Sequence, residues 1–102
     1  LHGVDLYSAT LTGADLSGVD LSGANLTGVD LRWVTLTEAN LTGVDLTGID
    51  LTGANLAGAD LSGVDLSEAD LSEVNLRRTN LTGTTFCKTT MPGGELNNAS
   101  CD

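Results

Sequence analysis

The sequence predicts an all-β solenoid, in which short straight edges of chain are joined by tight corners. Leucine recurs at every fifth position from Leu1 to Leu81, and the residue two places before each leucine, from Val4 to Val74, is always Ala, Val or Ile. Glycine stands two places after many of these leucines. A helix would spread leucines at this spacing around its circumference, and a continuous strand would alternate them between its two faces. The pattern fits a chain that restarts its alternation at every corner.

Each repeat is predicted to contain one edge, a three-residue strand. The small apolar residue and the leucine point inward, and the Asp or Asn between them points outward. The Ser/Thr-Gly pair that follows is the corner, because a type II turn needs a positive φ at its second central residue and glycine supplies it. The single proline fits this scheme, since Met91-Pro92-Gly93 places proline at the first central position and Gly93 at the second.

The glycines also indicate how many edges make one coil. If every fourth repeat is stacked, Gly3, Gly23, Gly43, Gly63 and Gly83 align in one column. If every third repeat is stacked, the columns mix glycine with Trp33 and Arg78. The first arrangement gives four edges per coil, with the leucines stacked inside along the whole rod.

The run ADLSGVDLSGANLTGVDL, residues 14–31, resembles the pentapeptide-repeat proteins, whose repeat is A(D/N)LXX. The resemblance covers about residues 4–85 and implies a right-handed quadrilateral β-helix of about five coils. The ending FCKTTMPGG, followed by a later cysteine, is similar to the close of many cyanobacterial members.

The repeat changes near its end. The inward small position becomes Thr79, Thr84 and Thr89, and the leucine position is continued by Phe86, Met91 and Leu96. Terminal repeats of solenoids differ from the others because one side of the last coil meets water. We therefore expect residues 1–85 to form the β-helix and residues 86–102 to form the rest of the last coil and a C-terminal cap. We expect the apolar coil end at Leu1 and Leu6 to be exposed and open to end-to-end self-association.

The charge of the chain limits its partners. Four Lys and Arg stand against 14 Asp and Glu, a formal net charge of -10. Nucleic acids and anionic membrane surfaces repel such a chain, so another protein, with a basic surface, is the expected partner. No apolar run approaches the roughly 18 residues of a membrane span.

Two groups of residues are candidate interaction sites. Stacking every fourth repeat aligns Asp30, Asp50 and Asp70 on one face, and Asp45 with Asp65 on another. One interpretation of these columns is local hydrogen bonding at the turns, and the other is a surface that imitates DNA.

The second candidate is Trp33 beside Arg32, at a corner whose column neighbours are Gly13 and Gly53. An exposed Trp next to Arg is typical of a binding hot spot, and the alternative is a Trp that lies on its own protein.

Cofactors, metals and catalysis have no support in the pattern. His2 is the only histidine, and a filled solenoid has no pocket of its own for a catalytic set. Cys87 and Cys101 lie in the irregular C-terminal segment, where a disulfide and two free thiols are both open. We expect a soluble chain, in the cytoplasm or, if the two cysteines pair, in the periplasm or thylakoid lumen.

Three functions follow as hypotheses. The first is a non-enzymatic protein-interaction or scaffold module. The second comes from the family resemblance, which includes quinolone-resistance proteins that bind DNA gyrase: a DNA-mimicking inhibitor or protector of gyrase or another topoisomerase. The third, ice or flat-surface binding, uses the column Ser22, Thr42, Ser62 and Thr82, but Arg32, Ala57 and Arg77 interrupt the other Ser/Thr columns.

Overall fold

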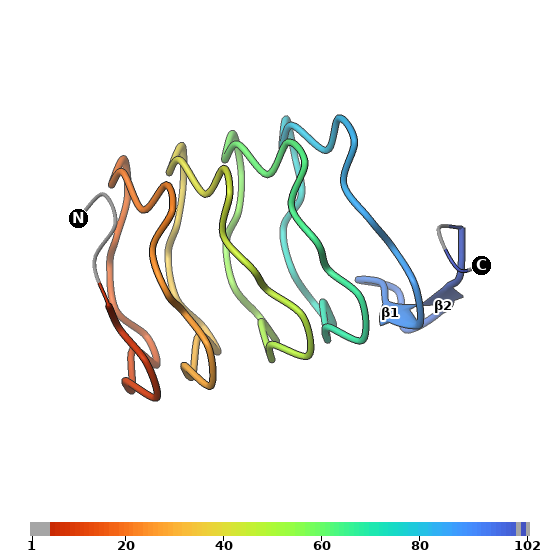
Figure 1. The fold of residues 1–102 in the computed structure, drawn as a ribbon, viewed down its shortest axis with the longest axis horizontal. Helices are drawn as coiled ribbons and strands as arrows, with labels where there is room; N and C mark the ends of the chain where they lie inside the picture. The colour runs from red at the N-terminus through yellow and green to blue at the C-terminus, as the bar shows by residue number, and fades with distance from the viewer. Residues whose placement is uncertain (1–4, 100, 102) are drawn as a thin grey trace.

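The chain winds into a rod of stacked coils, 32 × 25 × 23 Å overall (Figure 1). The computed structural model describes residues 5–99 and residue 101, and no helix occurs among them. Parallel bridges join residues that are four repeats apart in sequence, such as Asp15 with Thr35 and Thr35 with Asn55. The predicted stacking of every fourth repeat is confirmed, and each coil therefore has four edges.

Every corner forces one residue into the left-handed region of φ. The leucine carbonyl accepts a hydrogen bond from the N–H three residues later, as from Ala24 to Leu21 at 2.9 Å. The residue just before that N–H is the predicted glycine in most repeats, for example Gly43 with φ 75°. Non-glycine residues with φ of 55–62° take the same position at Ser8, Trp33, Glu38, Glu68, Glu73, Arg78 and Lys88. Because this conformation costs an L-residue about 1–2 kcal/mol, the stacking of the coils must impose it at these corners.

The outward Asp and Asn side chains hold the corners in place. Asp20 Oδ1 accepts the backbone N–H of Ser22 at 2.9 Å and the Ser22 hydroxyl at 2.6 Å. Asn40 Oδ1 accepts the same two bonds from Thr42, at 3.0 and 2.7 Å. These bonds agree with the first interpretation of the acidic columns, local hydrogen bonding at the turns. They also explain why either Asp or Asn can stand just before each leucine, since both supply the Oδ1 acceptor.

The leucines form the core. Every leucine from Leu21 to Leu71 is at most 1% exposed, and the small residues between them are also buried. The first coil is less covered, since Leu6, Leu11 and Leu16 are only partly buried. Leu6, where an exposed coil end was expected, is half-buried, and Leu1 lies outside the described residues.

Three threonine hydroxyls find their partners inside the last coil. Thr79, Thr84 and Thr89 each donate to the carbonyl of the leucine 23 residues earlier, at 2.7–2.8 Å. Thr84 and Thr89 are buried, at 9% and 0% exposure. A buried hydroxyl without a partner would be costly, so these bonds are what allows a polar residue at the inward position.

The chain ends in an antiparallel hairpin, which corrects two expectations. Strand β1, Thr89–Thr90, pairs with strand β2, Leu96–Asn97 (Figure 1). The prediction that Leu96 continues the inner leucine column is wrong, because the hairpin reverses the chain and leaves Leu96 59% exposed.

The hairpin also changes the turn around Pro92. Gly94 N–H donates to Met91 O at 2.8 Å, and Met91 N–H donates to Glu95 O at 2.8 Å. The positive φ, 90°, belongs to Gly94 and not to Gly93. The prediction for Gly93 is therefore wrong: the turn is of type I, followed by a glycine bulge, a geometry that joins two antiparallel strands.

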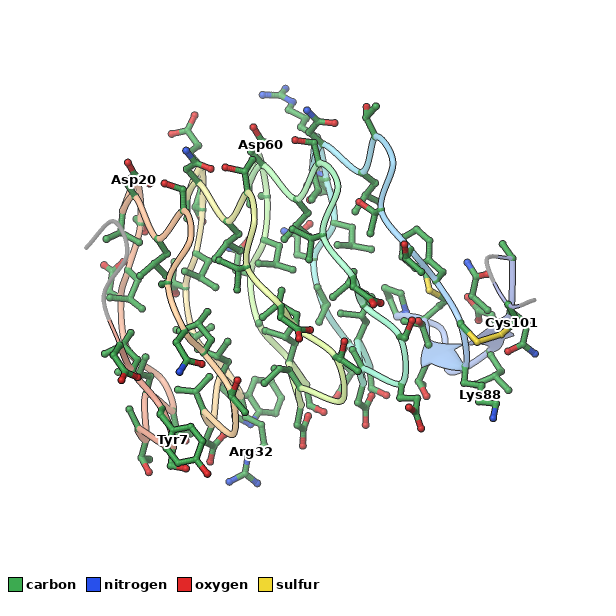
Figure 2. The ribbon with its side chains drawn as sticks, in the orientation of Figure 1. Tyr7, Asp20, Arg32, Asp60, Lys88 and Cys101 are labelled. Atoms are coloured by element: carbon green, nitrogen blue, oxygen red, sulfur yellow. A yellow bond between two sulfur atoms is a disulfide. The ribbon has the colours of Figure 1, made fainter. Side chains whose placement is uncertain are left out.

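The structure joins Cys87 to Cys101 in a disulfide, with their Cα atoms 4.8 Å apart. Lys88 N–H, next to Cys87, donates to Asn98 Oδ1 at 2.9 Å. Both contacts tie the segment after β2 to the last coil (Figure 2). A disulfide closing a loop of this size stabilises by about 3 kcal/mol in the chain-entropy model.

The buried leucines supply a direct test of the inside and outside assignments. Leu46→Ala should lower the free energy of unfolding by about 2–5 kcal/mol, because it leaves a cavity at a fully buried position. Thr47→Ala, one residue along and exposed, should change it by about 0.5 kcal/mol or less. Urea unfolding of both variants measures the difference, and a harmless Leu46→Ala with a destructive Thr47→Ala would reverse the assignment.

Candidate functional site

Both exposed aromatic residues lie along one face of the rod, here called the tryptophan face. It consists of the edge column Thr10, Asp30, Asp50, Asp70 and Thr90, with the corner residues on either side of that column. Tyr7 and Trp33 occupy these corners and are 65% and 56% exposed. Figure 2 shows Tyr7 and Arg32 along the lower edge of the rod, while Asp20 and Asp60 lie at the opposite edge.

Trp33 lies against the next coil. A Cβ placed at Gly53 would overlap the six-membered ring of Trp33, so the ring occupies the space that a side chain would fill. The Trp33 backbone N–H also donates to Thr52 O at 2.9 Å. One side of the indole is therefore held by its own protein, and more than half of the residue stays open to a partner.

Arg32 forms an ion pair with Asp30 beside this tryptophan. Arg32 Nε donates to Asp30 Oδ1 at 3.0 Å, and Nη2 donates to Oδ2 at 2.8 Å. These bonds hold the pKa of Asp30 well below its usual range, with help from the Arg32 backbone N–H. Because the Arg32 side chain is 50% exposed, the pair is a surface feature that orients Arg32 more than it stabilises the fold.

The other predicted acidic residues divide between two faces. Asp50 and Asp70 are bridged in the column of the tryptophan face, and Asp45 and Asp65 are bridged on the neighbouring face. The Oδ1 atom of each accepts a hydrogen bond from the backbone N–H two residues later, at 2.8–3.0 Å. Each keeps its second carboxylate oxygen for solvent or a partner. The structure thus brings Asp30, Arg32, Trp33 and Asp50 together and leaves Asp45 and Asp65 apart from them.

A shallow cleft of about 370 Å³ opens on the tryptophan face between two coils. It is lined by residues 28–30, Arg32 and residues 47–50. Here the bridge between Asp30 and Asp50 that the four-repeat pattern predicts is missing, although Thr10 with Asp30 and Asp50 with Asp70 are both bridged. A second shallow cleft, about 270 Å³, lies at another corner beside Arg77 and Arg78.

Two further findings concern chemistry and membranes. Within residues 5–99 and residue 101, no three His, Cys, Asp or Glu side chains are placed to hold a metal ion. His2, the only histidine, lies outside the described residues. In the same residues no helix has the length and hydropathy needed to cross a membrane.

Sequence reasoning missed Tyr7 and the cleft. Tyr7 could have been found, because it is the only aromatic residue at a position otherwise held mostly by Ser and Thr, and its corner borders that of Trp33. The cleft leaves a weaker signal in the sequence: Val29 and Ile49 are neighbours in one inward column, whose other residues are Ala9, Ala69 and Thr89.

The fold and the regular turn chemistry define a class of solenoid, and comparison with known proteins names it. A family model described as "Pentapeptide repeats (8 copies)" matches residues 1–37, 30–67 and 65–100. The chain belongs to the pentapeptide-repeat family, whose fold is a right-handed quadrilateral β-helix. Comparison with proteins of curated function gave no match.

Three solved structures illustrate the likeness. The pentapeptide repeat protein Rfr23 from the cyanobacterium Cyanothece 51142 is 37% identical, with a TM-score of 0.79 over 88% of this chain and 59% of that one. A pentapeptide repeat protein from the Arabidopsis thaliana thylakoid lumen is 34% identical, with a TM-score of 0.59 over 90% and 61%. QnrB1, a plasmid-mediated fluoroquinolone resistance protein, shares the fold at 18% identity, with a TM-score of 0.52 over 93% and 73%. The chain thus spans about three fifths of the first two relatives.

The contact between Trp33 and Gly53 can be tested with paired glycine variants. Gly43→Ala should cost about 1 kcal/mol, since its new Cβ has room and meets only the strain of positive φ. Gly53→Ala carries the same strain and must also displace the indole ring, so it should cost more. Trp33 is the only tryptophan, and its fluorescence should shift toward the red in Gly53→Ala and stay unchanged in Gly43→Ala. Unchanged fluorescence in both variants would place the ring elsewhere.

The acidic columns predict a loss of stability in acid. Hydrogen bonds from the side chains of Ser17, Thr47 and Ser62 lower the pKa values of Asp15, Asp45 and Asp60. A carboxyl whose pKa is lower in the folded chain stabilises it fully above the unfolded value, 3.8, and loses that contribution as the pH falls through the folded value. The midpoint temperature of thermal unfolding should therefore decrease as the pH is lowered below about 4.

The matched control is Asp60→Asn. Asn40 and Asn80 make the same turn bond in the same column, so the variant should fold and lose stability less steeply in acid. A midpoint that rises as the carboxylates are protonated would mean that repulsion within the net charge of -10 outweighs these bonds.

Proposed function

We propose that the chain is a non-enzymatic protein-interaction or scaffold module that docks another protein on the tryptophan face. The observation that carries this proposal is the exposure of Trp33 beside the ordered Arg32. Trp and Arg side chains are enriched where interfaces gain most of their binding energy. Tyr7, on the neighbouring corner, adds a second aromatic contact to the same face.

The packing of the interior supports a role that does not involve catalysis. The leucine columns fill the inside of the coils, and the clefts are shallow openings between corners. Enzyme sites are usually concave pockets that enclose most of a ligand. A rigid rod with a flat, ordered surface instead suits the presentation of side chains at fixed spacing.

The expected partner is a protein with a basic surface. On the tryptophan face, Asp50, Glu68, Asp70 and Glu73 gather on two successive coils, whereas the Asp30 charge is already paired with Arg32. A basic partner would be drawn to the acidic part and held by the aromatic part. Such binding should weaken as salt is added, because the charges are exposed.

Affinity capture with three baits tests this proposal. The wild-type chain should retain a partner protein that Trp33→Ala loses. Glu38→Ala is the matched control, because Glu38 is an exposed corner residue with φ 60° that lies off this face, and it should bind like the wild type. Equal capture by all three baits would overturn the assignment of the face. A turnover screen that finds catalysis abolished by a single surface substitution would overturn the non-enzymatic role.

The alternative is a DNA-mimicking inhibitor of DNA gyrase or another topoisomerase. The columns of aspartates, each with an outward carboxylate oxygen, favour it. The fold shared with a fluoroquinolone resistance protein supports the architecture only. A gyrase supercoiling assay decides: inhibition or protection at stoichiometric amounts would establish this function, and no effect at large excess would remove it.

The half-covered first coil supports a second mode of contact, end-to-end association of two copies. Leu6, Leu11 and Leu16 present apolar surface that the next coil covers elsewhere in the rod. Sedimentation equilibrium would reveal a dimer that Leu11→Lys disrupts. A concentration-independent monomer would exclude it and leave the tryptophan face unaffected.

A further inference from the structure

The coil-to-coil ladder of hydrogen bonds is interrupted most extensively where residues 24–31 face residues 44–50, a region here called the seam. In the coil below, Leu11 N–H donates to Asp30 O and Asp30 N–H donates to Ala9 O, both at 3.0 Å. In the coil above, Leu51 N–H donates to Asp70 O at 2.9 Å and Asp70 N–H to Ile49 O at 3.0 Å. The corresponding bonds between Asp50 and its neighbours Val29 and Leu31 are absent from this part of the described chain.

The interruption extends along two edges and the corner between them. Within the described residues, five N–H groups that should point across the seam find no backbone carbonyl there, those of Leu26, Gly28, Leu31, Asp45 and Asp50. Beyond it the ladder resumes, since Trp33 N–H donates to Thr52 O at 2.9 Å and Gly23 N–H to Thr42 O at 3.1 Å. The cleft of about 370 Å³ lies along this opening.

The interior at the seam explains the separation. Val29 and Ile49, both 4% exposed, stack directly in successive coils. In the neighbouring column, by contrast, alanines lie both above and below the larger residue, as Ala14 and Ala54 do around Val34. Two branched side chains need more room along the rod axis than one coil spacing provides, and an overfilled core moves the backbone.

A second branched pair shows the same effect in a weaker form. Val44 stacks with Val64, and the Asp65 N–H that should donate to Val44 O makes no such bond among the described residues. Leu46 N–H still donates to Asp65 O, at 3.2 Å, whereas the equivalent bonds from Leu16 and Leu71 measure 2.7 and 2.8 Å.

We propose that the seam is a site of local opening within the rod. The coils before it and the coils after it move apart and come together there as two rigid bodies. The closed state gains the missing hydrogen bonds and compresses Val29 against Ile49. The open state relieves that compression and exposes the unpaired amides. Because the seam runs under Asp30, Arg32 and Asp50, opening and closing changes the shape of the tryptophan face. The seam itself follows from interior packing and does not depend on the proposed docking function.

Amide hydrogen exchange of the wild-type chain, resolved by residue with NMR, tests this local opening. The repeat supplies matched pairs of identical residues one coil apart: Leu31 with Leu51, Gly28 with Gly48, and Asp50 with Asp70. The amide protons of Leu31, Gly28 and Asp50 face the seam. Each should exchange about ten-fold or more faster than that of its matched residue, Leu51, Gly48 or Asp70. Equal rates within all three pairs would overturn the proposal.

Two variants test the cause. Ile49→Ala and Val29→Ala each leave an alanine in the crowded stack, so they should slow exchange at Leu31 and Asp50 to the rates of Leu51 and Asp70. Val34→Ala, a similar truncation where the ladder is already closed, should give no such local slowing. Exchange at the seam that stays fast in both alanine variants would show that crowding does not open it. Should one variant fail to fold, the other decides.

Discussion

The stacking of one coil on the next at a spacing of four repeats is the constraint on which the rest of the structure depends. A three-residue edge is too short to be stable alone, and its backbone groups are satisfied only by the coils before and after it. The same stacking places leucine on leucine. Backbone hydrogen bonding and the burial of apolar side chains therefore favour the same alignment of successive coils. It also imposes positive φ at corners held by Glu or Arg, residues that would avoid this conformation in isolation.

Surface chemistry in this chain is built from positions that the fold leaves free. The outward Asp or Asn uses one oxygen for its turn, so the position is structural and, where the residue is Asp, also carries a charge. The corner after each leucine tolerates many residues, and it is there that Tyr7, Arg32 and Trp33 appear. A regular solenoid can therefore acquire a binding face without disturbing its core, because the side chains that would make contact carry little of the packing.

Most of the fold could be predicted from the sequence, because the same local pattern of residues recurs in almost every repeat. The inward leucines, the corner glycines and the column of all-glycine corners follow from period and turn chemistry alone. The C-terminal hairpin could not be predicted, since Pro92-Gly93-Gly94 offers two glycines for one positive φ and only the pairing of β1 with β2 selects Gly94. The position of Trp33 could be predicted from its column, because Gly53 leaves the space in which the ring lies. The cleft could not, because it depends on the summed volume of Val29 and Ile49 in a shared stack.

Contacts between backbone protons of residues in successive coils measure the register most directly. Nuclear Overhauser effects should connect Thr35 with Asn55 and Asn55 with Asn75, each pair four repeats apart. Four edges per coil, the leucine core and the tryptophan face all require these contacts. Contacts between Asn40 and Asn55, three repeats apart, would instead establish a three-edged coil, and the face that joins Tyr7, Arg32 and Trp33 would not exist.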